Sequence, residues 1–259
     1  MRSKHKARIG WRKRLNQRAV KLKKGLYILP HLFTFGNAFF GFCSLIFAAR
    51  GEHAIAAHLI LFGALMDMLD GRIARYLGTT SLFGVQLDSL SDVLSFCCAP
   101  AFLYYSWLLS RWGLIGAMIS FLFVMAGMIR LARFNLIHDK QTLFFLGLPT
   151  TMAGCFLVTV LLNAERVTHY QYANVAGSLL IIALSYLMVS TLPFPAFKQR
   201  LFKEKKNWRF VIGGILFAIV AVMRVHHVLL YLFLLYFIYA VSAMVRMDKQ
   251  HSLMERQQV

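Results

Sequence analysis

Residues 54–76 read AIAAHLILFGALMDMLDGRIARY. The first two thirds of this stretch are almost entirely apolar, and its charged residues gather at the carboxyl end. A helix crosses the bilayer core with about 20 predominantly apolar residues. The stretch therefore predicts a transmembrane helix whose carboxyl end carries acidic and basic side chains.

Seven more segments of the chain have a similar apolar character. With the first, they give eight predicted spans, at 32–49, 54–76, 85–109, 114–131, 148–162, 173–192, 210–223 and 228–245. The connections between spans carry turn and breaker residues, and none is long enough to hold a soluble domain. The sequence thus predicts an all-α, polytopic integral membrane protein with about eight transmembrane helices.

The composition excludes a soluble domain of this size. Apolar residues make up 59% of the 259 residues and charged residues 15%, against about 45–50% and 25% in a typical soluble domain. So few charges could not cover so much apolar surface in water. The four cysteines all lie in apolar stretches without zinc-ligand spacing, so we interpret them as small packing residues.

The distribution of basic residues predicts the orientation in the membrane. The net charge is +19, which would suggest nucleic-acid binding in a soluble protein. In membrane proteins, however, Lys and Arg collect in cytoplasmic loops. Eight spans put both termini on one side, and that side carries 25 of the 29 Lys and Arg residues. Both termini are therefore predicted to be cytoplasmic, and no nucleic acid is expected as a partner.

Four aspartates lie where apolar helices are predicted. Asp67 and Asp70 lie near the end of the second span, and Asp88 and Asp92 near the start of the third. A charge in a helix near hydrocarbon is unfavourable and is a functional hypothesis by default. At 100° per residue each pair lies on one helix face, and the short connection favours antiparallel neighbours. The four carboxylates are expected to converge in a cleft open to the cytoplasm.

Convergent carboxylates repel one another unless cations are bound. Oxygen-only ligands suit Mg²⁺ or Mn²⁺, and four acids can hold two ions, an arrangement used for displacement at phosphorus. An ion or proton transporter is the alternative from a different class of protein. Transporters place such acids near the bilayer midplane, often on broken helices, whereas these acids lie at one end of their predicted spans.

The four acids belong to a longer pattern, Asp67-x2-Asp70-Gly71-x2-Ala74-Arg75-x8-Gly84-x3-Asp88-x3-Asp92. This pattern resembles the signature of the CDP-alcohol phosphotransferase family, and every fixed position of the signature is present. Members of the family cleave the diphosphate of a CDP-linked lipid, release CMP and join the phosphatidyl group to an alcohol. The resemblance implies a membrane-embedded enzyme that uses divalent metal ions, Mg²⁺ or Mn²⁺, as cofactors.

The resemblance also implies a role for each matching residue. Asp67, Asp70 and Asp88, together with Asp92, are expected to bind the metal ions, and Asp92 is expected to act as the general base. The residues expected to bind the CDP-lipid are Gly71, Ala74, Arg75, Ser81 and Gly84. From the residues alone, the small side chains are also explained by close helix packing, and Arg75 by anchoring at the interface.

Three further segments resemble family members that use serine as the acceptor. These segments are Leu29-Pro30-His31-Leu32-Phe33-Thr34-Phe35-Gly36-Asn37, Arg130-Leu131-Ala132-Arg133-Phe134-Asn135 and Gly147-Leu148-Pro149. His31 departs from the Asn that is commoner in those members. By this resemblance Arg130, Arg133 and Asn135 are expected to bind serine, whose carboxylate an arginine can hold. From the residues alone, the two arginines are explained equally well as anchors on the cytoplasmic side. Thr34 and Asn37 are expected to contact the nucleotide or a phosphate, or else to cap a helix.

The resemblance completes the expected organisation and partners. The parts are a basic tail (1–24), the catalytic core (25–195), a basic loop (196–209), two C-terminal transmembrane helices (210–245) and a cytoplasmic tail (246–259). The N-terminal tail is either an interfacial helix on anionic lipid or a disordered segment that sets the topology.

The expected substrates are CDP-diacylglycerol and L-serine; glycerol phosphate, inositol phosphate and choline are alternative acceptors. The expected location is a bacterial inner membrane, among membrane lipids, with the active site facing the cytoplasm. The resemblance also implies a homodimer.

Overall fold

The computed structural model describes residues 28–137, 144–164, 172–195, 229–240 and 242. The predicted basic tail, basic loop, seventh span and C-terminal tail lie outside the described residues. In chain order the described elements are the first helix (Ile28–Ala49), α2 (His53–Leu77), the third helix (Leu82–Trp112), α5 (Leu114–Ile137), β1 (Phe144–Leu146), α6 (Thr150–Ala164), α7 (Ala173–Val189), β2 (Pro193–Pro195) and the C-terminal helix (Leu229–Ala240).

The helices have the length and the surface of membrane spans. The first helix, α2, the third helix and α5 are each long and apolar enough to cross a bilayer, and the other three are shorter apolar helices. Large hydrophobic side chains are exposed along them, such as Leu32 (63%), Phe39 (61%) and Ile115 (65%). Proteins in water rarely expose such a surface, whereas lipid covers it. A helical, polytopic membrane protein is thus confirmed; the number of crossings and the side of the termini stay predictions.

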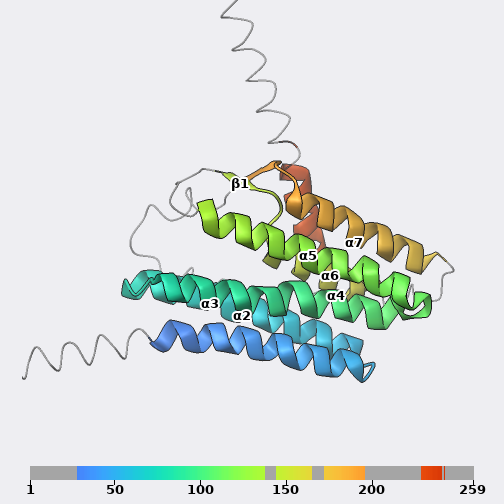
Figure 1. Ribbon diagram of the computed structural model, residues 1–259, viewed down its shortest axis with the longest axis horizontal. Coiled ribbons are helices and arrows are strands. Elements are labelled where there is room, and N and C mark those ends of the chain that lie inside the picture. Colours follow the sequence, from blue (N-terminus) through green and yellow to red (C-terminus); the bar gives the residue numbers. More distant parts are fainter. Residues whose placement is uncertain (1–27, 138–143, 165–171, 196–228, 241, 243–259) are drawn as a thin grey trace, which may run out of the picture.

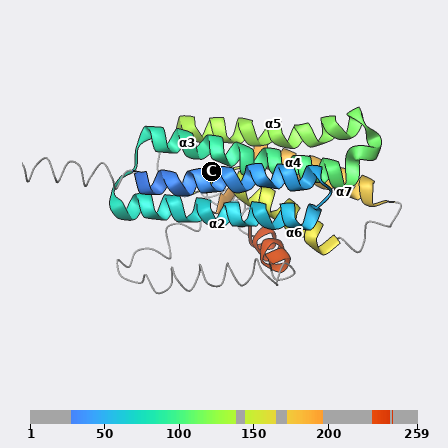
Figure 2. The same ribbon diagram turned by 90° about the horizontal axis from the view of Figure 1, so that it is seen from below.

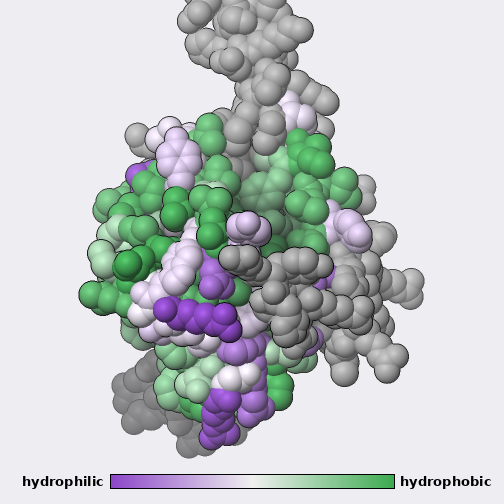
Figure 3. All heavy atoms as spheres, turned by 90° about the vertical axis from the view of Figure 1, so that its right-hand side faces the viewer, coloured by the Kyte–Doolittle hydropathy of each residue, from purple (hydrophilic) through white to green (hydrophobic). Residues whose placement is uncertain are grey.

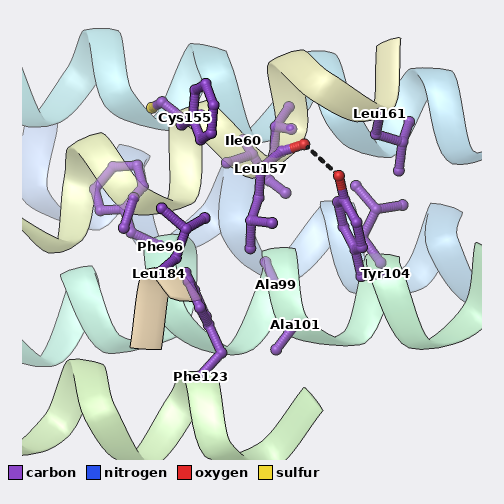
Figure 4. Close-up of a cluster of buried hydrophobic side chains, with 14 of the residues drawn as sticks. Ile60, Phe96, Ala99, Ala101, Tyr104, Phe123, Cys155, Leu157, Leu161 and Leu184 are labelled. Atoms are coloured by element: carbon purple, nitrogen blue, oxygen red, sulfur yellow. Dashed lines mark hydrogen bonds between the residues drawn. The ribbon is translucent and has the colours of Figure 1, made fainter. Parts of the chain in front are cut away.

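The four long helices and α7 lie side by side along a common direction (Figures 1 and 2). α5 packs along α7 and α2 along α6, while the third helix contacts all four of them. Their shared core contains Phe96, Tyr104, Leu157 and Leu184, all almost fully buried (Figure 4). The Tyr104 hydroxyl donates a hydrogen bond to the Leu157 carbonyl oxygen at 3.1 Å. The one polar group of this aromatic side chain is therefore satisfied inside the core.

The third helix departs from regular α-helical geometry. It consists of α3 (Leu82–Asp92), a π-helical segment (Val93–Cys98), α4 (Ala99–Tyr104), a second π-helical segment (Tyr105–Leu109) and a 3₁₀ turn (Ser110–Trp112). Pro100 accounts for the first π-helical segment, because proline lacks an N–H and its ring crowds the carbonyl four residues earlier. That carbonyl belongs to Phe96 and faces α6, where a Cβ on Gly154 would lie 2.7 Å from its oxygen.

A short antiparallel β pair, absent from the all-α prediction, joins the segments before α6 and after α7. Phe145 pairs with Phe194 in the two-stranded sheet of β1 and β2. At the adjoining Gly147, φ is 77°, and its N–H donates to the Leu192 carbonyl oxygen at 2.9 Å. A side chain on Gly147 would collide with the Met188 carbonyl oxygen. This explains why glycine stands in the Gly-Leu-Pro segment: both the backbone conformation and the close approach require it.

Figure 3 views the end of the bundle where the first helix turns into α2. Arg50 and Glu52 of that turn are exposed, as is Arg111 of the 3₁₀ turn. Hydrophilic residues gather across the middle of this end, and hydrophobic residues cover its sides. Arg50 and Arg111 belong to the small group of basic residues that the sequence assigns to the non-cytoplasmic side. The pattern fits a bundle whose sides face lipid and whose end reaches water.

Candidate active site

A pocket of about 490 Å³ lies at the opposite end of the bundle. Its lining comes from the start of the first helix, the end of α2 and the turn that follows, α3, the end of α5 and the start of α6. The polar residues in its walls carry carboxylate, guanidinium, hydroxyl and amide groups. A mixed polar pocket beside apolar helix flanks suits a ligand with a charged head and hydrocarbon tails.

The turn between α2 and α3 brings the acidic residues together. Gly78 ends α2 in the left-handed conformation, with φ 62°, which glycine adopts without steric penalty. Ser81 then caps α3, and its Oγ accepts a hydrogen bond from the Gly84 N–H at 3.0 Å. From this turn α2 and α3 run in opposite directions, as predicted, and carboxylates from both helices converge (Figure 1).

Three of the four aspartates form one cluster. Carboxylate oxygens of Asp67, Asp70 and Asp88 all lie within 4.8 Å of one another. Asp70 is only 5% exposed, and the buried Oδ1 of Asp88 has no hydrogen-bond partner among the described residues. Three converging carboxylates with an unpaired buried oxygen are the donor set that a hard divalent cation prefers. The residues present thus fit the metal ions that the sequence resemblance implies.

Asp92 has different surroundings from the cluster. It lies one turn beyond Asp88 on α3, is 8% exposed and still lines the pocket. It falls outside the group of three whose oxygens converge. Its Oδ1 accepts a hydrogen bond from Asn37 Nδ2 at 3.4 Å. The structure thus separates Asp92 from the cluster. Asp70, Asp88 and Asp92 line the pocket, whereas Asp67 belongs to the cluster but is not part of the lining.

The two polar residues of the first helix both reach aspartates. Thr34 lines the pocket, and its Oγ1 lies 2.8 Å from Asp70 Oδ2, to which it can donate. Asn37 is completely buried, contacts Asp92 and is not among the residues that line the pocket. The sequence placed both residues at the nucleotide or a phosphate. In the structure only Thr34 is in a position to touch a ligand.

The residues expected to bind the CDP-lipid all line the pocket: Gly71, Ala74, Arg75, Ser81 and Gly84. Arg75 folds back over Gly71, where a Cβ would lie 3.5 Å from its Nη1. Arg75 thereby shares the pocket with Asp70 and Asp88 of the acidic cluster. A cation beside a metal-binding carboxylate cluster is well placed to neutralise phosphate oxygens.

The residues expected to bind serine divide into two groups. Arg130 lines the pocket; its Nη1 donates to Thr150 Oγ1 at 3.2 Å, and its guanidinium lies 5.6 Å from the Phe134 ring centroid. Its buried Nε has no partner among the described residues. Asn135 also lines the pocket and donates to Ser89 Oγ at 3.0 Å. Arg133 is not part of the lining: its Nη1 donates to the Val189 carbonyl oxygen at 2.9 Å, at the end of α7.

Some pocket residues were given no role by the sequence analysis. Among them are His31, Thr79, Thr80, Ser89, Pro149 and Thr151. His31 packs edge-on against Phe83, with ring centroids 5.7 Å apart, and reaches the space beside Gly84. The departure of His31 from the commoner Asn marked its position. For Ser89 and Thr151 the signal was weaker, a hydroxyl next to a predicted site residue or motif.

The fold and the pocket together define a class: a helical membrane protein with an acidic, metal-compatible site at one end of its bundle. The sequence model of the CDP-alcohol phosphatidyltransferase family matches residues 27–245, and the chain belongs to this family. The match runs through the C-terminal helix, beyond the part of the chain where the sequence motifs had indicated a resemblance.

Curated relatives cover most of the chain. A CDP-diacylglycerol–serine O-phosphatidyltransferase of Helicobacter pylori is 35% identical over 219 residues, 83% of this chain and 90% of that protein. An enzyme of the same name from Bacillus subtilis is 31% identical over 182 residues, 70% of this chain and 98% of that protein. An archaetidylserine synthase of Methanothermobacter thermautotrophicus is 35% identical over 169 residues, 64% of this chain and 69% of that protein.

Proposed function

We propose that the chain transfers the phosphatidyl group of CDP-diacylglycerol to the hydroxyl of L-serine, forming phosphatidylserine and CMP. The observation that carries this proposal is that Arg130 lines the same pocket as Asp70 and Asp88, which form a cluster with Asp67. The cluster suits a diphosphate with its metal ions, and the buried arginine suits a carboxylate. The names of the relatives agree, since they share serine as the acceptor although their lipids differ.

The acidic cluster and Arg75 define the donor side of the reaction. Asp67, Asp70 and Asp88 would hold the divalent ions, two by analogy with other phosphoryl-transfer sites, with Asp92 as a further candidate ligand. When bound, such ions neutralise the charge that builds on the diphosphate as CMP departs. Arg75 would add its own charge at the phosphates. Gly71, Ala74 and Gly84 line the same pocket. The absence of a side chain at Gly71 and Gly84 leaves the space into which Arg75 and His31 reach.

Asp92 and Arg130 define the acceptor side. A serine hydroxyl is a weak nucleophile, so a base near it accelerates attack. Asp92 would accept the hydroxyl proton as the new bond forms between the serine oxygen and the phosphatidyl phosphorus. The bond from that phosphorus to the bridging oxygen breaks, and CMP leaves with the electron pair. Arg130, through its unpaired Nε, would hold the serine carboxylate.

The pocket position also supports a location for the enzyme. The lipid tails could remain in the bilayer beside the apolar helix flanks while the headgroup reacts in the pocket. We place the protein in the bacterial inner membrane with this pocket facing the cytoplasm, as the basic-residue distribution predicts. A homodimer belongs to the same proposal. Ion or proton transport is less well supported, because the acids lie at one end of the bundle.

The test is an assay of the purified, detergent-solubilised protein with CDP-diacylglycerol and labelled serine. We expect equal amounts of labelled phosphatidylserine and CMP, abolished by EDTA and restored by Mg²⁺ or Mn²⁺. Glycerol phosphate, inositol phosphate and choline serve as competing acceptors. If a lipid product formed with one of these alcohols and none formed with serine, that alcohol would be the acceptor. Full activity in a rigorously metal-free sample would contradict the metal-dependent mechanism.

A further inference from the structure

The first helix is fastened to the third helix beside the acidic site. Ser91 Oγ donates to the Thr34 carbonyl oxygen at 3.0 Å, and Ser95 Oγ donates to the Asn37 carbonyl oxygen at 2.9 Å. A side chain on Gly41 would overlap Ser95, so the two helices approach closely here. Hydrogen bonds from side chains to backbone oxygens fix both the distance and the register of the helices. The backbone at Asn37 is therefore held in place relative to Asp92.

From this fixed backbone, the Asn37 side chain faces Asp92 inside the protein. Asn37 is 0% exposed, does not line the pocket and places Nδ2 3.4 Å from Asp92 Oδ1. A carboxylate only accepts hydrogen bonds, so the amide N–H₂ rather than the amide oxygen must face it. Such bonds are often long before substrate binds and tighten in the reacting complex. Any effect of Asn37 on the reaction therefore passes through Asp92.

The amide oxygen of Asn37 is held against α2. A Cβ on Gly63 would lie 3.0 Å from Asn37 Oδ1, tighter than an ordinary contact. This oxygen has no hydrogen-bond partner among the described residues. A buried acceptor without a partner is unfavourable, and an apolar side chain would avoid it. The presence of an amide at this position is therefore not explained by packing alone.

We propose that Asn37 is a positioning residue, which acts through Asp92. Its amide, seated against Gly63 and anchored at its backbone by Ser95, holds the Asp92 carboxylate in the orientation that faces the pocket. Gly63 serves the same purpose by leaving room for the amide. This inference rests on the role proposed for Asp92 as the base. It assigns Asn37 a function other than contact with the nucleotide.

The first test is a kinetic comparison of Asn37→Ala with the wild-type protein. Without the amide, the carboxylate can rotate away from the hydroxyl, and small misplacements of reacting groups lower rates up to a hundredfold. We expect kcat to fall by about 10- to 100-fold. The KM for CDP-diacylglycerol and the Mn²⁺ concentration for half-maximal activity should change by less than about twofold, because no ligand-binding group is lost.

Thermal unfolding with and without CDP and Mn²⁺ separates positioning from a structural role. Asn37→Ala should retain the stabilisation by these ligands, which shows that the folded site persists. Asn37→Ser, whose hydroxyl fits the same space but is too short to reach Asp92, should show the same kcat loss. A kcat within about twofold of wild type in either folded variant would overturn the proposal. So would failure of both variants to fold, since Asn37 would then be a structural residue.

Gly63 provides an independent test with a matched control. Gly63→Ala should displace the amide and lower kcat as Asn37→Ala does. Gly36→Ala, on the first helix next to Asn37, is the control, because its Cβ would make only ordinary contacts with Met66, at 3.6 Å or more. In the double variant Asn37→Ala/Gly63→Ala the crowded amide is gone, so kcat should be no lower than in Asn37→Ala. Additive losses, or a normal kcat in Gly63→Ala, would contradict the proposal.

The same assay with Asp92→Asn distinguishes this inference from the proposed function. Normal turnover in Asp92→Asn would refute Asp92 as the base, and the role of Asn37 with it. An inactive Asp92→Asn beside fully active Asn37→Ala and Asn37→Ser would refute the positioning role alone. The predicted pattern is an inactive Asp92→Asn with partly active Asn37 and Gly63 variants.

Discussion

Asp88 and Asp92 are one helical turn apart on α3, yet their surroundings differ. Asp88 joins Asp67 and Asp70 in a cluster and keeps an unpaired buried oxygen. Asp92 lies outside that cluster and accepts a hydrogen bond from an amide. These different surroundings support the roles that we propose for the identical side chains: cation binding at the cluster and acceptance of a proton at Asp92.

Asparagine substitutions test this division of roles. Asp92→Asn keeps the shape of the side chain but cannot accept the serine proton, so turnover should fall by about 10²–10⁴-fold. Nucleotide and Mn²⁺ binding should largely survive. Asp67→Asn removes a metal-ligand charge and should weaken both kinds of binding. Binding of CDP-diacylglycerol and turnover are measured for each variant with metal present. Equal loss of binding in the two variants would make Asp92 a plain ligand.

Arg130 and Arg133 give a second contrast at the scale of single residues. Sequence alone assigned both to serine, whereas the structure puts Arg130 in the pocket and Arg133 on the Val189 carbonyl. A hydrogen bond to a charged group contributes about 1.5–3 kcal/mol. Arg130→Ala should therefore raise the serine KM about ten- to hundredfold and leave the KM for CDP-diacylglycerol nearly unchanged.

Arg133→Ala is the matched comparison for Arg130→Ala. It removes a contact between α5 and the end of α7, so it should lower the unfolding temperature and change the serine KM by less than about threefold. A large rise of the serine KM in Arg133→Ala, with none in Arg130→Ala, would exchange the roles of the two arginines. Normal serine KM values in both variants would show that neither arginine binds serine.

At the scale of elements, the α2–α3 hairpin was predictable because its information is local. The Asp spacing, the Gly78 turn and the Ser81 cap all lie within one short stretch. The π-helical segment after Asp92 was not predicted, although Pro100 is a local signal for it. The β1–β2 pair was not predicted, because it depends on contacts between distant segments. The same is true of Asn37: the sequence marked its polarity, but only the packing of three helices reveals that it faces Asp92 and Gly63.

The contact between α6 and the third helix leads to a prediction about stability. Gly154 leaves room for the Phe96 carbonyl, which a Cβ would meet at 2.7 Å. Gly154→Ala must push the two helices apart, and such overpacking lowers the free energy of unfolding by about 1–3 kcal/mol. Thermal unfolding in detergent measures the effect, with Gly36→Ala as the control substitution. An unchanged unfolding temperature in Gly154→Ala would show that the backbone moves apart without penalty.

For the molecule as a whole, the two ends of the bundle differ in chemistry. One end carries the acidic pocket, and the other carries the turns with Arg50 and Arg111. The positive-inside rule assigns the pocket end to the cytoplasm.

Reporter fusions test the orientation directly. Fusions at Lys206 and at the C-terminus should report a cytoplasmic location. Fusions at Gly51 and at Glu165 should report the opposite side, because an odd number of predicted spans precedes each of them. The readout is the activity of a paired reporter that works on only one side of the membrane. A cytoplasmic signal at Glu165 would contradict the predicted fifth span and the predicted orientation of the spans after it.

The π-helical segment after Asp92 has a consequence for how the chain can change during evolution. Upstream of it, α3 must keep its register with α2, because the acids converge only at that spacing. Downstream, α4 is constrained by the core and by lipid. Deleting one residue from Val93–Cys98 would rotate the far half by about 100° relative to the acids. Side chains on either half can therefore change during evolution. A change in the number of residues between the halves would instead move the acids out of register with the packed core.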